Sequence, residues 1–413
     1  MRNLKRKFRA GLICGALCLA SVSAQAAPLP SWDDQMEALK DVGNRLMEES
    51  GRNDTEERRQ EMYKYILGTI ADGYLNHVNQ DPARPLWTPL WNYAFNLGGP
   101  NPDYVYMKTL IDPKGVYRIS GYRGTSKFVE ISERTPEFEK RDKPHTTPDT
   151  YDLDMLKIAN DGYFSVIMSA ERPAGYNGDW WKLHPETKML IMRKTAVDWR
   201  KEVDPRIAID RLDDVPLDTP STISARFSEL NDFIYGQIIS DINLAKYYRD
   251  NHGINVIKMS ERAKKNLPGQ VYLDGAFEIS DNEALVVEVK LPENCRYWDI
   301  LVADDRFATI DWVNRQSSLN AAQAQIDKAG YLRAVISARD PGVPNWLDTA
   351  GERWGIMQMR WNRCSSAPEP EVKRVALKDV RKYLPADTPD VTPAERREQL
   401  RLRREAAQFR QLW

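Results

Sequence analysis

The sequence predicts an α+β protein with two related antiparallel β units, an N-terminal helical hairpin and a long helix between the units. Apolar residues recur at helical spacing in residues 31–74 and again in residues 222–245. Runs rich in β-branched and aromatic residues, separated by turn residues, fill most of the remaining chain. Two of these runs, Gly162–Gly175 and Gly330–Gly342, also repeat the same order of residue types, which indicates related units.

Shifts in composition divide the chain into six segments. They are a signal peptide (1–26), a helical hairpin with a connection rich in Pro and Trp (27–100), a first β unit (101–215), a connecting helix (216–269), a second β unit (270–384) and a linker with a C-terminal amphipathic helix (385–413).

The first segment has the features of a secretory signal. A basic start precedes the short apolar run Ala10–Ala24, and Ala24-Gln25-Ala26 supplies the small residues of a cleavage site. The apolar run is too short for a membrane anchor, and no later run reaches spanning length. We therefore expect a soluble periplasmic or secreted protein whose mature part carries 54 basic and 60 acidic residues, a net charge of −6. That acidic balance argues against nucleic acid as a partner.

The helices are predicted from caps and apolar stripes. Ser31 caps a helix that ends near Gly51, and a second helix begins at Asp54 with Glu57, which together form an αα-hairpin. Ser221 or Thr222 is expected to cap the connecting helix. In the aromatic connection that follows the hairpin, packing is the first interpretation and a ligand-stacking platform the second; its rings belong to Trp87, Trp91, Tyr93 and Phe95.

Strands are predicted in both β units from period-two alternation. The predicted ranges are 116–120, 127–131, 163–169, 189–193, 284–290, 297–302, 308–313, 331–338 and 355–361. After each of the two repeated runs comes a loop with Asn and Trp and then a strand with Ile-Met. The alternative is that two ordinary hairpins share the same turn chemistry.

The segment Arg339–Gly351 is the predicted functional loop. Its two prolines and two glycines exclude a regular helix or a central strand, and shaped loops on a rigid scaffold often carry function. The candidate catalytic residues are a carboxylate base and an anion-binding arginine with a second carboxylate; these are Asp348, Arg339 and Asp311. The candidate binding residues are Trp346, Asn345, Asp340 and Arg306. The structural alternative is that the arginines form ion pairs that fix a proline-rich loop.

Several common chemistries have no motif in this sequence. The four histidines do not pair at metal-ligand spacing, so we expect no metal site of the common zinc type. No phosphate-binding loop, dinucleotide fingerprint or nucleophile elbow occurs, so no cofactor is expected. If the protein is an enzyme, a cofactor-independent hydrolase or lyase using carboxylate and arginine groups is the predicted type.

Two cysteines, Cys295 and Cys364, lie beyond the signal segment. An oxidising compartment permits one disulfide between them, and two buried free thiols are the alternative. At the C-terminus, Thr392 and Glu395 form a capping box with Pro at the first helical position. The apolar stripe of this helix consists of Leu402, Ala406, Phe409 and Trp413. It is expected to dock on the same chain or on a second copy as a homo-oligomer contact, and binding to a membrane surface is the alternative.

Four stretches resemble the domain-of-unknown-function 1214 family: Asn101–Asp103, Tyr117–Thr125, Cys295–Trp298 and, above all, Arg339–Gly351. The similarity runs from about Asn101 to Leu384. It implies a jelly-roll-like β-sandwich in the second unit. Asp304-Asp305-Arg306 stands where the family commonly has an Asn-Arg pair, which argues against a role that needs an amide at Asp305. The resemblance implies no reaction, so no catalytic assignment is carried over.

Two functions follow as hypotheses. The first is an exported protein that binds a small polar or ring-containing molecule such as a saccharide, or that binds it and transforms it without metal or nucleotide. The second is a non-catalytic envelope protein whose helices mediate assembly. A water-accessible hollow beside the predicted functional loop favours the first, and burial of that loop in closed ion pairs favours the second.

Overall fold

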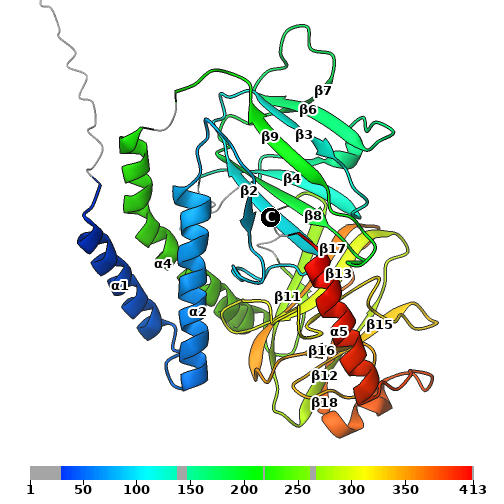
Figure 1. The fold of residues 1–413 in the computed structure, drawn as a ribbon. Coiled ribbons are helices and arrows are strands. Elements are labelled where there is room, and N and C mark those ends of the chain that lie inside the picture. Colours follow the sequence, from blue (N-terminus) through cyan, green and yellow to red (C-terminus); the bar gives the residue numbers. More distant parts are fainter. Residues whose placement is uncertain (1–28, 137–146, 217–218, 261–266, 412–413) are drawn as a thin grey trace, which may run out of the picture.

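The computed structural model describes residues 29–136, 147–216, 219–260 and 267–411 (Figure 1). The predicted signal segment and Trp413 lie outside these residues. Two β-sandwiches lie one above the other, three helices pack to one side of them, and a C-terminal helix runs along the outside. The predicted α+β class with a helical hairpin and a long helix between two β units is therefore confirmed.

The N-terminal hairpin is formed by α1 (Trp32–Glu49) and α2 (Glu56–Gly73), and α2 continues into a π-helical turn at Tyr74–Val78. Ser31 caps α1 as predicted, because its hydroxyl accepts from the backbone N–H of Asp34. The cap of α2 is Thr55, one residue after the predicted start.

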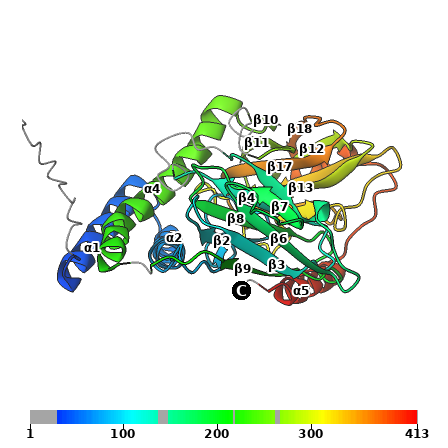
Figure 2. The same ribbon diagram turned by 90° about the horizontal axis from the view of Figure 1, so that it is seen from above.

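The long helix α4 (Pro220–His252) lies across the hairpin and continues to the second β unit (Figure 2). Its cap is Thr219 instead of the expected Ser221 or Thr222, since Pro220 takes the first helical position, where its missing N–H costs nothing. Leu46, Met62, Ile234 and Ile238 are fully buried where the three helices meet. No helix in the described part of the chain is both long and apolar enough to cross a membrane.

The first β unit contains two sheets, with strand orders β1-β2-β8-β4-β5 and β7-β6-β3-β9. Its strands are β1 (Thr88–Leu90), β2 (Tyr104–Leu110), β3 (Tyr117–Tyr122), β4 (Phe128–Arg134), β5 (Thr150–Asp152), β6 (Tyr163–Ser169), β7 (Asp179–Lys182), β8 (Met189–Thr195) and β9 (Arg206–Arg211). A short 3-10 turn, Leu153–Met155, follows β5.

The second β unit has the orders β10-β11-β17-β13-β14 and β16-β15-β12-β18. Its strands are β10 (Lys258–Met259), β11 (Gln270–Glu278), β12 (Glu283–Lys290), β13 (Cys295–Ala303), β14 (Ser318–Asn320), β15 (Tyr331–Ser337), β16 (Trp346–Asp348), β17 (Trp354–Cys364) and β18 (Glu371–Ala376). A 3-10 segment, Leu377–Tyr383, follows, and α5 (Pro393–Phe409) ends the described chain.

The two units have the same topology. When the strands of each unit are numbered in chain order, both larger sheets and both smaller sheets have identical orders. Each unit also contains one parallel pair at the same place, β6 with β7 and β15 with β16. The prediction of two related β units, made from the repeated runs, is thus confirmed by strand order.

One predicted strand, residues 308–313, is irregular in the structure apart from a single bridge at Thr309. Asp311 explains the difference, because its carboxylate accepts from the backbone N–H groups of Val313 and Asn314 and holds a turn there. A local side-chain hydrogen bond competes with strand pairing at this point.

Each sandwich has its own apolar core between its two sheets. Met107, Ile119 and Leu190 belong to the first core, and Leu285, Ile300 and Trp361 to the second. All six side chains are 4% exposed or less, which at about 25 cal/mol per Å² of buried apolar surface makes the cores the main source of stability.

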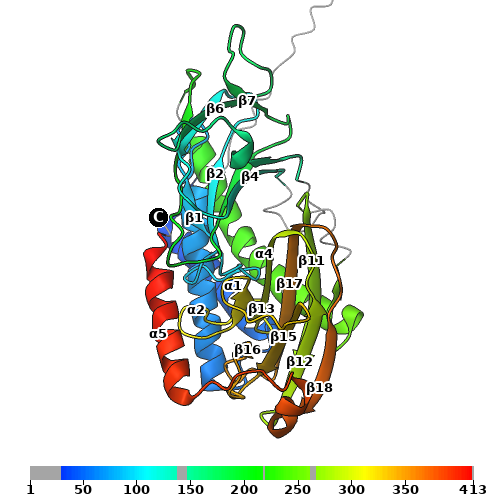
Figure 3. The ribbon, with the colours of Figure 1, turned by 90° about the vertical axis from the view of Figure 1, so that its right-hand side faces the viewer.

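The two larger sheets face each other, and we call the contact between them the seam (Figure 3). Rings from both units meet there: Tyr297 of β13 lies 5.6 Å from Tyr104 and 5.8 Å from Phe128, measured between ring centroids. Polar groups also cross the seam, since the Tyr104 hydroxyl donates to Gln270 at 3.0 Å. The units are therefore packed against one another by both rings and hydrogen bonds.

Cys295 and Cys364 form a disulfide between β13 and β17. The two residues lie opposite each other in the ladder and are 69 positions apart in sequence. By the chain-entropy model, closing a loop of that length stabilises a fold by about 4 kcal/mol.

The C-terminal helix α5 runs along both units and docks through arginines (Figure 3). Its capping box at Thr392 and Glu395 is present as predicted. Arg396, Arg403 and Arg410 recur every seven residues, so they share one face. Arg396 and Arg410 are 4% and 7% exposed, whereas Phe409 of the expected docking stripe is 57% exposed. Of the expected apolar stripe, Ala406 is buried and Leu402 half-buried, whereas Phe409 is exposed. The arginines make the hydrogen bonds of the contact, because buried carbonyl and carboxylate groups of both units select arginine.

Candidate functional site

The predicted functional loop crosses from β15 to the parallel strand β16 in residues 338–345. The last part of the predicted loop, Trp346–Asp348, is itself strand. From outside, α5 covers the crossover: Arg396 donates to Asp340 at 2.9 Å and to the carbonyl of Val343 at 2.5 Å. The loop is thus held by ion pairing and hydrogen bonds. This agrees with the structural alternative, in which ion pairs with arginine fix a proline-rich loop.

The indole of Trp346 is buried, with 6% of the residue exposed. Its Nε1–H donates to the carbonyl of Ser337 at 3.1 Å, and the Arg396 guanidinium lies 5.3 Å from its ring centroid. An indole covered by a cation and hydrogen bonded to the backbone contributes to packing, and its face is not available for stacking on a ligand.

The other predicted site residues lie in separate places. Asn345 donates to the carbonyls of Gln325 and Arg333 at 2.7 and 3.0 Å. Asp348 accepts from Arg315 at 2.8 Å. The structure therefore does not bring these two side chains together around one ligand-sized space.

Arg339 and Arg306 each have separate partners in the second unit. Arg339 is exposed and donates to the carbonyl of Asp281 at 3.1 Å. Arg306 is 8% exposed, donates from Nε to Asp304 at 2.8 Å and lies 3.5 Å from Glu61 of α2. Arg306 thus helps to join the hairpin to the second unit.

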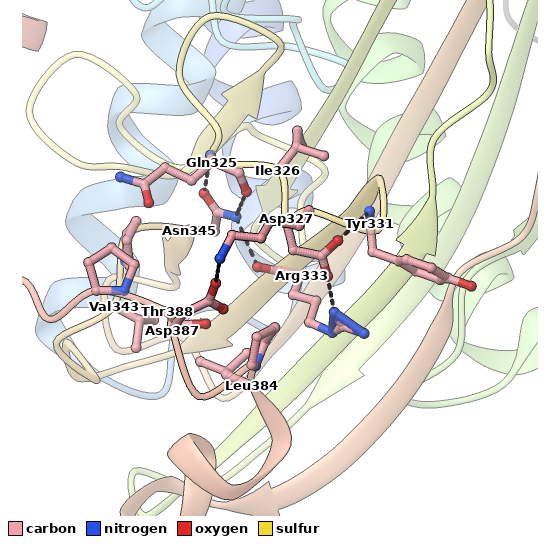
Figure 4. A pocket seen from close by; sticks show the side chains of 14 residues that line it. Gln325, Ile326, Asp327, Tyr331, Arg333, Val343, Asn345, Leu384, Asp387 and Thr388 are labelled. Carbon is pink, nitrogen blue, oxygen red and sulfur yellow. Dashed lines mark hydrogen bonds and ion pairs between the residues drawn. The ribbon is translucent and has the colours of Figure 1, made fainter.

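A small pocket of about 190 Å³ lies beside the crossover (Figure 4). Arg333 binds Asp327 within it, and Lys328 reaches Asp387 at 2.7 Å across its rim. Asn345 faces this pocket, but its amide is already hydrogen bonded to the backbone. Ligand pockets are usually about 300–1,000 Å³, so this pocket is small for a ring-containing ligand.

A larger cleft of about 580 Å³ opens between the two units and α5. The aromatic connection supplies one wall, and the start of β2 with Trp199 supplies another. The turn at Asp311–Asn314 and the end of α5 complete the cleft. Its size falls within the usual range for small-molecule sites, and segments far apart in sequence build it. Asp311 is the predicted catalytic residue that lies here.

Aromatic rings form much of the lining. Tyr93 is 61% exposed, while Trp199 and Trp312 line the cleft but are largely buried, at 5% and 7% exposed. Trp199 is fixed in place: its Nε1–H donates to Asp103 at 2.7 Å, and the Arg403 guanidinium lies 4.6 Å from its ring. Fixed rings with one exposed tyrosine are suited to contact with an apolar or ring-shaped ligand face.

Amides and one carboxylate supply the polar lining. Asp311, the one carboxylate among the described lining residues, accepts from Asn314 Nδ2 at 2.8 Å. Asn92, Asn96, Asn314 and Gln408 also line the cleft. Glycosidic cleavage generally uses two facing carboxylates, so this lining fits binding better than that reaction.

Arg410, the one cation among the described residues that line the cleft, is already paired. Arg410 donates to Asp204 at 2.8 and 3.0 Å and to the carbonyl of Asp103 at 2.6 Å. Because these partners use its guanidinium, it offers little to an incoming anion. The local charge that remains is the carboxylate of Asp311, which favours a neutral polar ligand over an anionic one.

A strong electrostatic perturbation lies elsewhere, in the seam. Arg360 and Asp299 form an ion pair at 2.8 Å and are 3% and 1% exposed. Burial raises the pKa of Asp299 to about 7 in spite of the neighbouring guanidinium. Gln270 Nε2 and Asn362 Oδ1, nearby on the same sheet face, have no hydrogen-bond partner in the described part of the chain. This polar layer joins the units, and no large cleft described above opens onto it.

Sequence reasoning did not identify Trp199, Trp312 or α5 as parts of a site. One signal was available, because arginines spaced seven apart on a short helix indicate a single polar docking face. No local sequence pattern identifies Trp199 as a site residue, because its position depends on contacts with the second β unit and α5. Among the described residues, no group of three or more His, Cys, Asp or Glu side chains is arranged to hold a metal ion.

Comparison with known proteins gives a family and a fold. Residues 275–361 match a family described as "Protein of unknown function (DUF1214)". A crystal structure of an uncharacterized protein from Burkholderia cenocepacia has a TM-score of 0.76 and 25% identity, and the match covers 84% of this chain and 96% of that one. A protein from Vibrio parahaemolyticus gives a TM-score of 0.42 and 12% identity over 76% and 97% of the two chains. No curated protein sequence matches this chain. The resemblance to the DUF1214 family is therefore confirmed over residues 275–361, within the second β unit.

Proposed function

We propose that this protein is exported and binds a small, neutral, ring-containing polar molecule, such as a saccharide, in the cleft between the two units and α5. The observation that supports this most is the lining: an exposed tyrosine, two largely buried indoles, four side-chain amides and one carboxylate around about 580 Å³. Aromatic rings match the apolar faces of a sugar ring, and amides and carboxylates match its hydroxyl groups. No reaction is part of the proposal.

Tyr93 gives the sharpest test, because its ring is exposed and its removal leaves the core unchanged. The mature protein is first screened by thermal shift against neutral saccharides and other ring-containing metabolites. Titration calorimetry on a hit should then show about tenfold weaker binding for Tyr93→Ala, since an aromatic contact contributes about 1.4 kcal/mol. Tyr63→Ala on α2, an equally exposed tyrosine, is the matched control. Equal affinities of the two variants, or no hit at all, would contradict the proposal.

Asp311 is tested by an isosteric change. Asp311→Asn keeps the oxygen that accepts from Val313 and Asn314 but removes the negative charge. A neutral ligand should then bind within a few-fold of wild type, while an anionic ligand should gain affinity because a repulsive charge is lost. A large gain for a neutral ligand would show that the charge assignment of the cleft is wrong.

Export is proposed from residues 1–26 together with the disulfide, which persists mainly in oxidising compartments. Mass spectrometry of protein purified from cell fractions should find a mature chain that begins at Ala27. A full-length chain in the cytoplasmic fraction would contradict export.

A second candidate function is assembly through the helical hairpin, which the burial of the predicted functional loop beneath Arg396 also favours. Several large apolar residues are exposed along it, with Trp32 at 74%, Leu67 at 65% and Tyr74 at 52%. The C-terminal helix was the predicted oligomer contact, but its arginine face is used within the chain. Sedimentation of Leu67→Lys against wild type distinguishes the two functions: a change of mass supports assembly, and an unchanged monomer supports the binding function alone.

A further inference from the structure

Two arginines of the second unit flank the disulfide. Arg296 follows Cys295 in β13, and Arg363 precedes Cys364 in β17. The ladder pairs Cys295 with Cys364 and resumes two residues further on, but the rung that would pair the two arginines is missing. Arg363 has a φ of 48°, a left-handed backbone that is strained for a residue with a side chain. Like charges side by side on neighbouring strands are unfavourable by themselves.

The first unit presents the opposite charges in the same arrangement. Glu130 of β4 lies directly opposite Asp152 of β5, and these carboxylates are 0% and 6% exposed. Burial raises the pKa of Glu130. Burial opposes ionisation of Asp152 too, but the hydrogen bond from Arg296 lowers its pKa overall. The two carboxylates, and likewise the two arginines, are therefore unfavourable neighbours by themselves. Arg193, opposite Glu130 on β8, offsets part of the negative charge within the first unit, and the two arginines of the docked second unit add to that compensation.

The four charges meet across the seam. Arg296 binds Asp152, with Nη2 at 3.2 Å from a carboxylate oxygen, and approaches Glu130 to 3.8 Å. Arg363 reaches Asp152 at 3.1 Å and Glu130 at 3.4 Å. Each arginine thus contacts both carboxylates, so the two charge pairs compensate one another across the seam, and Arg296 also reaches Asp154 of the first unit at 2.9 Å. We call the two arginines with Glu130 and Asp152 the four-charge cluster.

We propose that the Cys295–Cys364 disulfide holds the two arginines in register for this cluster, so that its reduction loosens the docking of the first unit on the second. A dithiol reductant attacks one sulfur, the S–S bond breaks, and the two cysteines take up two electrons and two protons as thiols. The reductant leaves as its own disulfide. Cys295 lines a cleft of about 440 Å³ together with Arg296, which gives a small dithiol access. The proposal is independent of the ligand cleft.

Amide hydrogen exchange tests this, because it reports each unit separately. The folded protein is compared with and without a small dithiol at native pH. Loss of the disulfide should speed exchange in β13 and β17 whatever its role. The proposal adds that amides of β5, which belongs to the other unit and is not cross-linked by the disulfide, exchange about tenfold faster after reduction. Exchange in β12 and β15, on the far sheet of the second unit, should stay unchanged.

A pair of substitutions separates the arginines from the disulfide. In oxidised Arg296→Gln/Arg363→Gln, β5 should already exchange at the fast rate while β13 and β17 stay protected, and reduction should add nothing to β5. Arg374→Gln, an exposed arginine that pairs with Glu283 on β12, is the control and should leave β5 unchanged.

Three results would overturn the proposal. One is a β5 exchange rate that reduction leaves unchanged, which would restrict the disulfide to its own sandwich. A second is faster exchange in all strands, which would mean global unfolding. The third is slow β5 exchange in the oxidised arginine variant, because the arginines would then not be the link between the units.

Discussion

Glu133, near the end of β4, provides a pH-dependent test of the structure. The residue is 0% exposed, and its carboxylate accepts from the Thr187 hydroxyl at 2.8 Å and from the backbone N–H of His184 at 3.3 Å. Burial raises its pKa from 4.5 to about 7, and the two hydrogen bonds only partly offset that effect. We therefore expect the folded protein to hold a proton on Glu133 that the unfolded chain releases.

The sign and size of the effect follow from linkage. Between pH 4.5 and 7 the folded state binds more protons than the unfolded state, so stability falls as pH rises through that window. The contribution is fully present below the unfolded pKa and is lost as pH passes the folded one. Each pKa unit corresponds to 1.36 kcal/mol, so a shift from 4.5 to about 7 amounts to about 3 kcal/mol.

Glu133→Gln removes this titration and keeps the shape of the side chain. Urea unfolding of wild type and variant is measured from pH 4.5 to pH 7.5, and the free energy of unfolding of wild type minus that of the variant should fall by about 3 kcal/mol. Other groups cancel in this difference. Glu371→Gln, at an exposed glutamate, controls for the amide substitution itself. A difference that changes by less than about 1 kcal/mol across the range would refute the reasoning.

Two further predictions concern buried contacts. Arg396→Met should lower the free energy of urea unfolding by about 3–5 kcal/mol, because it leaves a carboxylate and a carbonyl of the crossover without their partner. The control Arg397→Met, at the exposed neighbouring arginine, should lower it far less. Equal losses for the two variants would contradict the role of Arg396 in holding the crossover. Gly275→Ala should prevent normal folding, since a Cβ there would meet the carbonyl oxygen of Val256 at 1.7 Å. Gly236→Ala in α4 meets nothing within 4 Å and should raise stability by about 1 kcal/mol, as thermal unfolding would show.

Elements with a strong local signal were predictable. The caps at Ser31 and Thr392 satisfy N–H groups only a few residues away, so sequence alone locates them. Long strands such as β6 were predicted residue for residue because alternation extends over the whole run. The short strands β5, β14 and β16 have three residues each and were not predicted. Three residues show no period, and pairing with a distant partner alone makes them strands.

The candidate site shows the same division. Composition correctly identified residues 339–345 as a shaped connection, but it did not show that Arg396, more than fifty residues later, would cover it. Asp311 was selected for its chemistry and does line the large cleft, whereas Trp346 was selected for its ring and is buried. Exposure depends on which distant segment packs on a residue, and no local pattern encodes that.

By itself the sequence determined the α+β class, the duplicated β units, the helix caps and the resemblance to the DUF1214 family, although the family match covers residues 275–361 and not the predicted 101–384. These depend on periodicity, turn chemistry and similarity, which are properties of neighbouring residues. Tertiary structure alone decided how the units meet, which cysteine neighbours face which carboxylates, and where a ligand-sized cleft opens. Those features arise from contacts between residues tens to hundreds of positions apart, and the burial and desolvation that they cause set both the charges and the shape of the cleft.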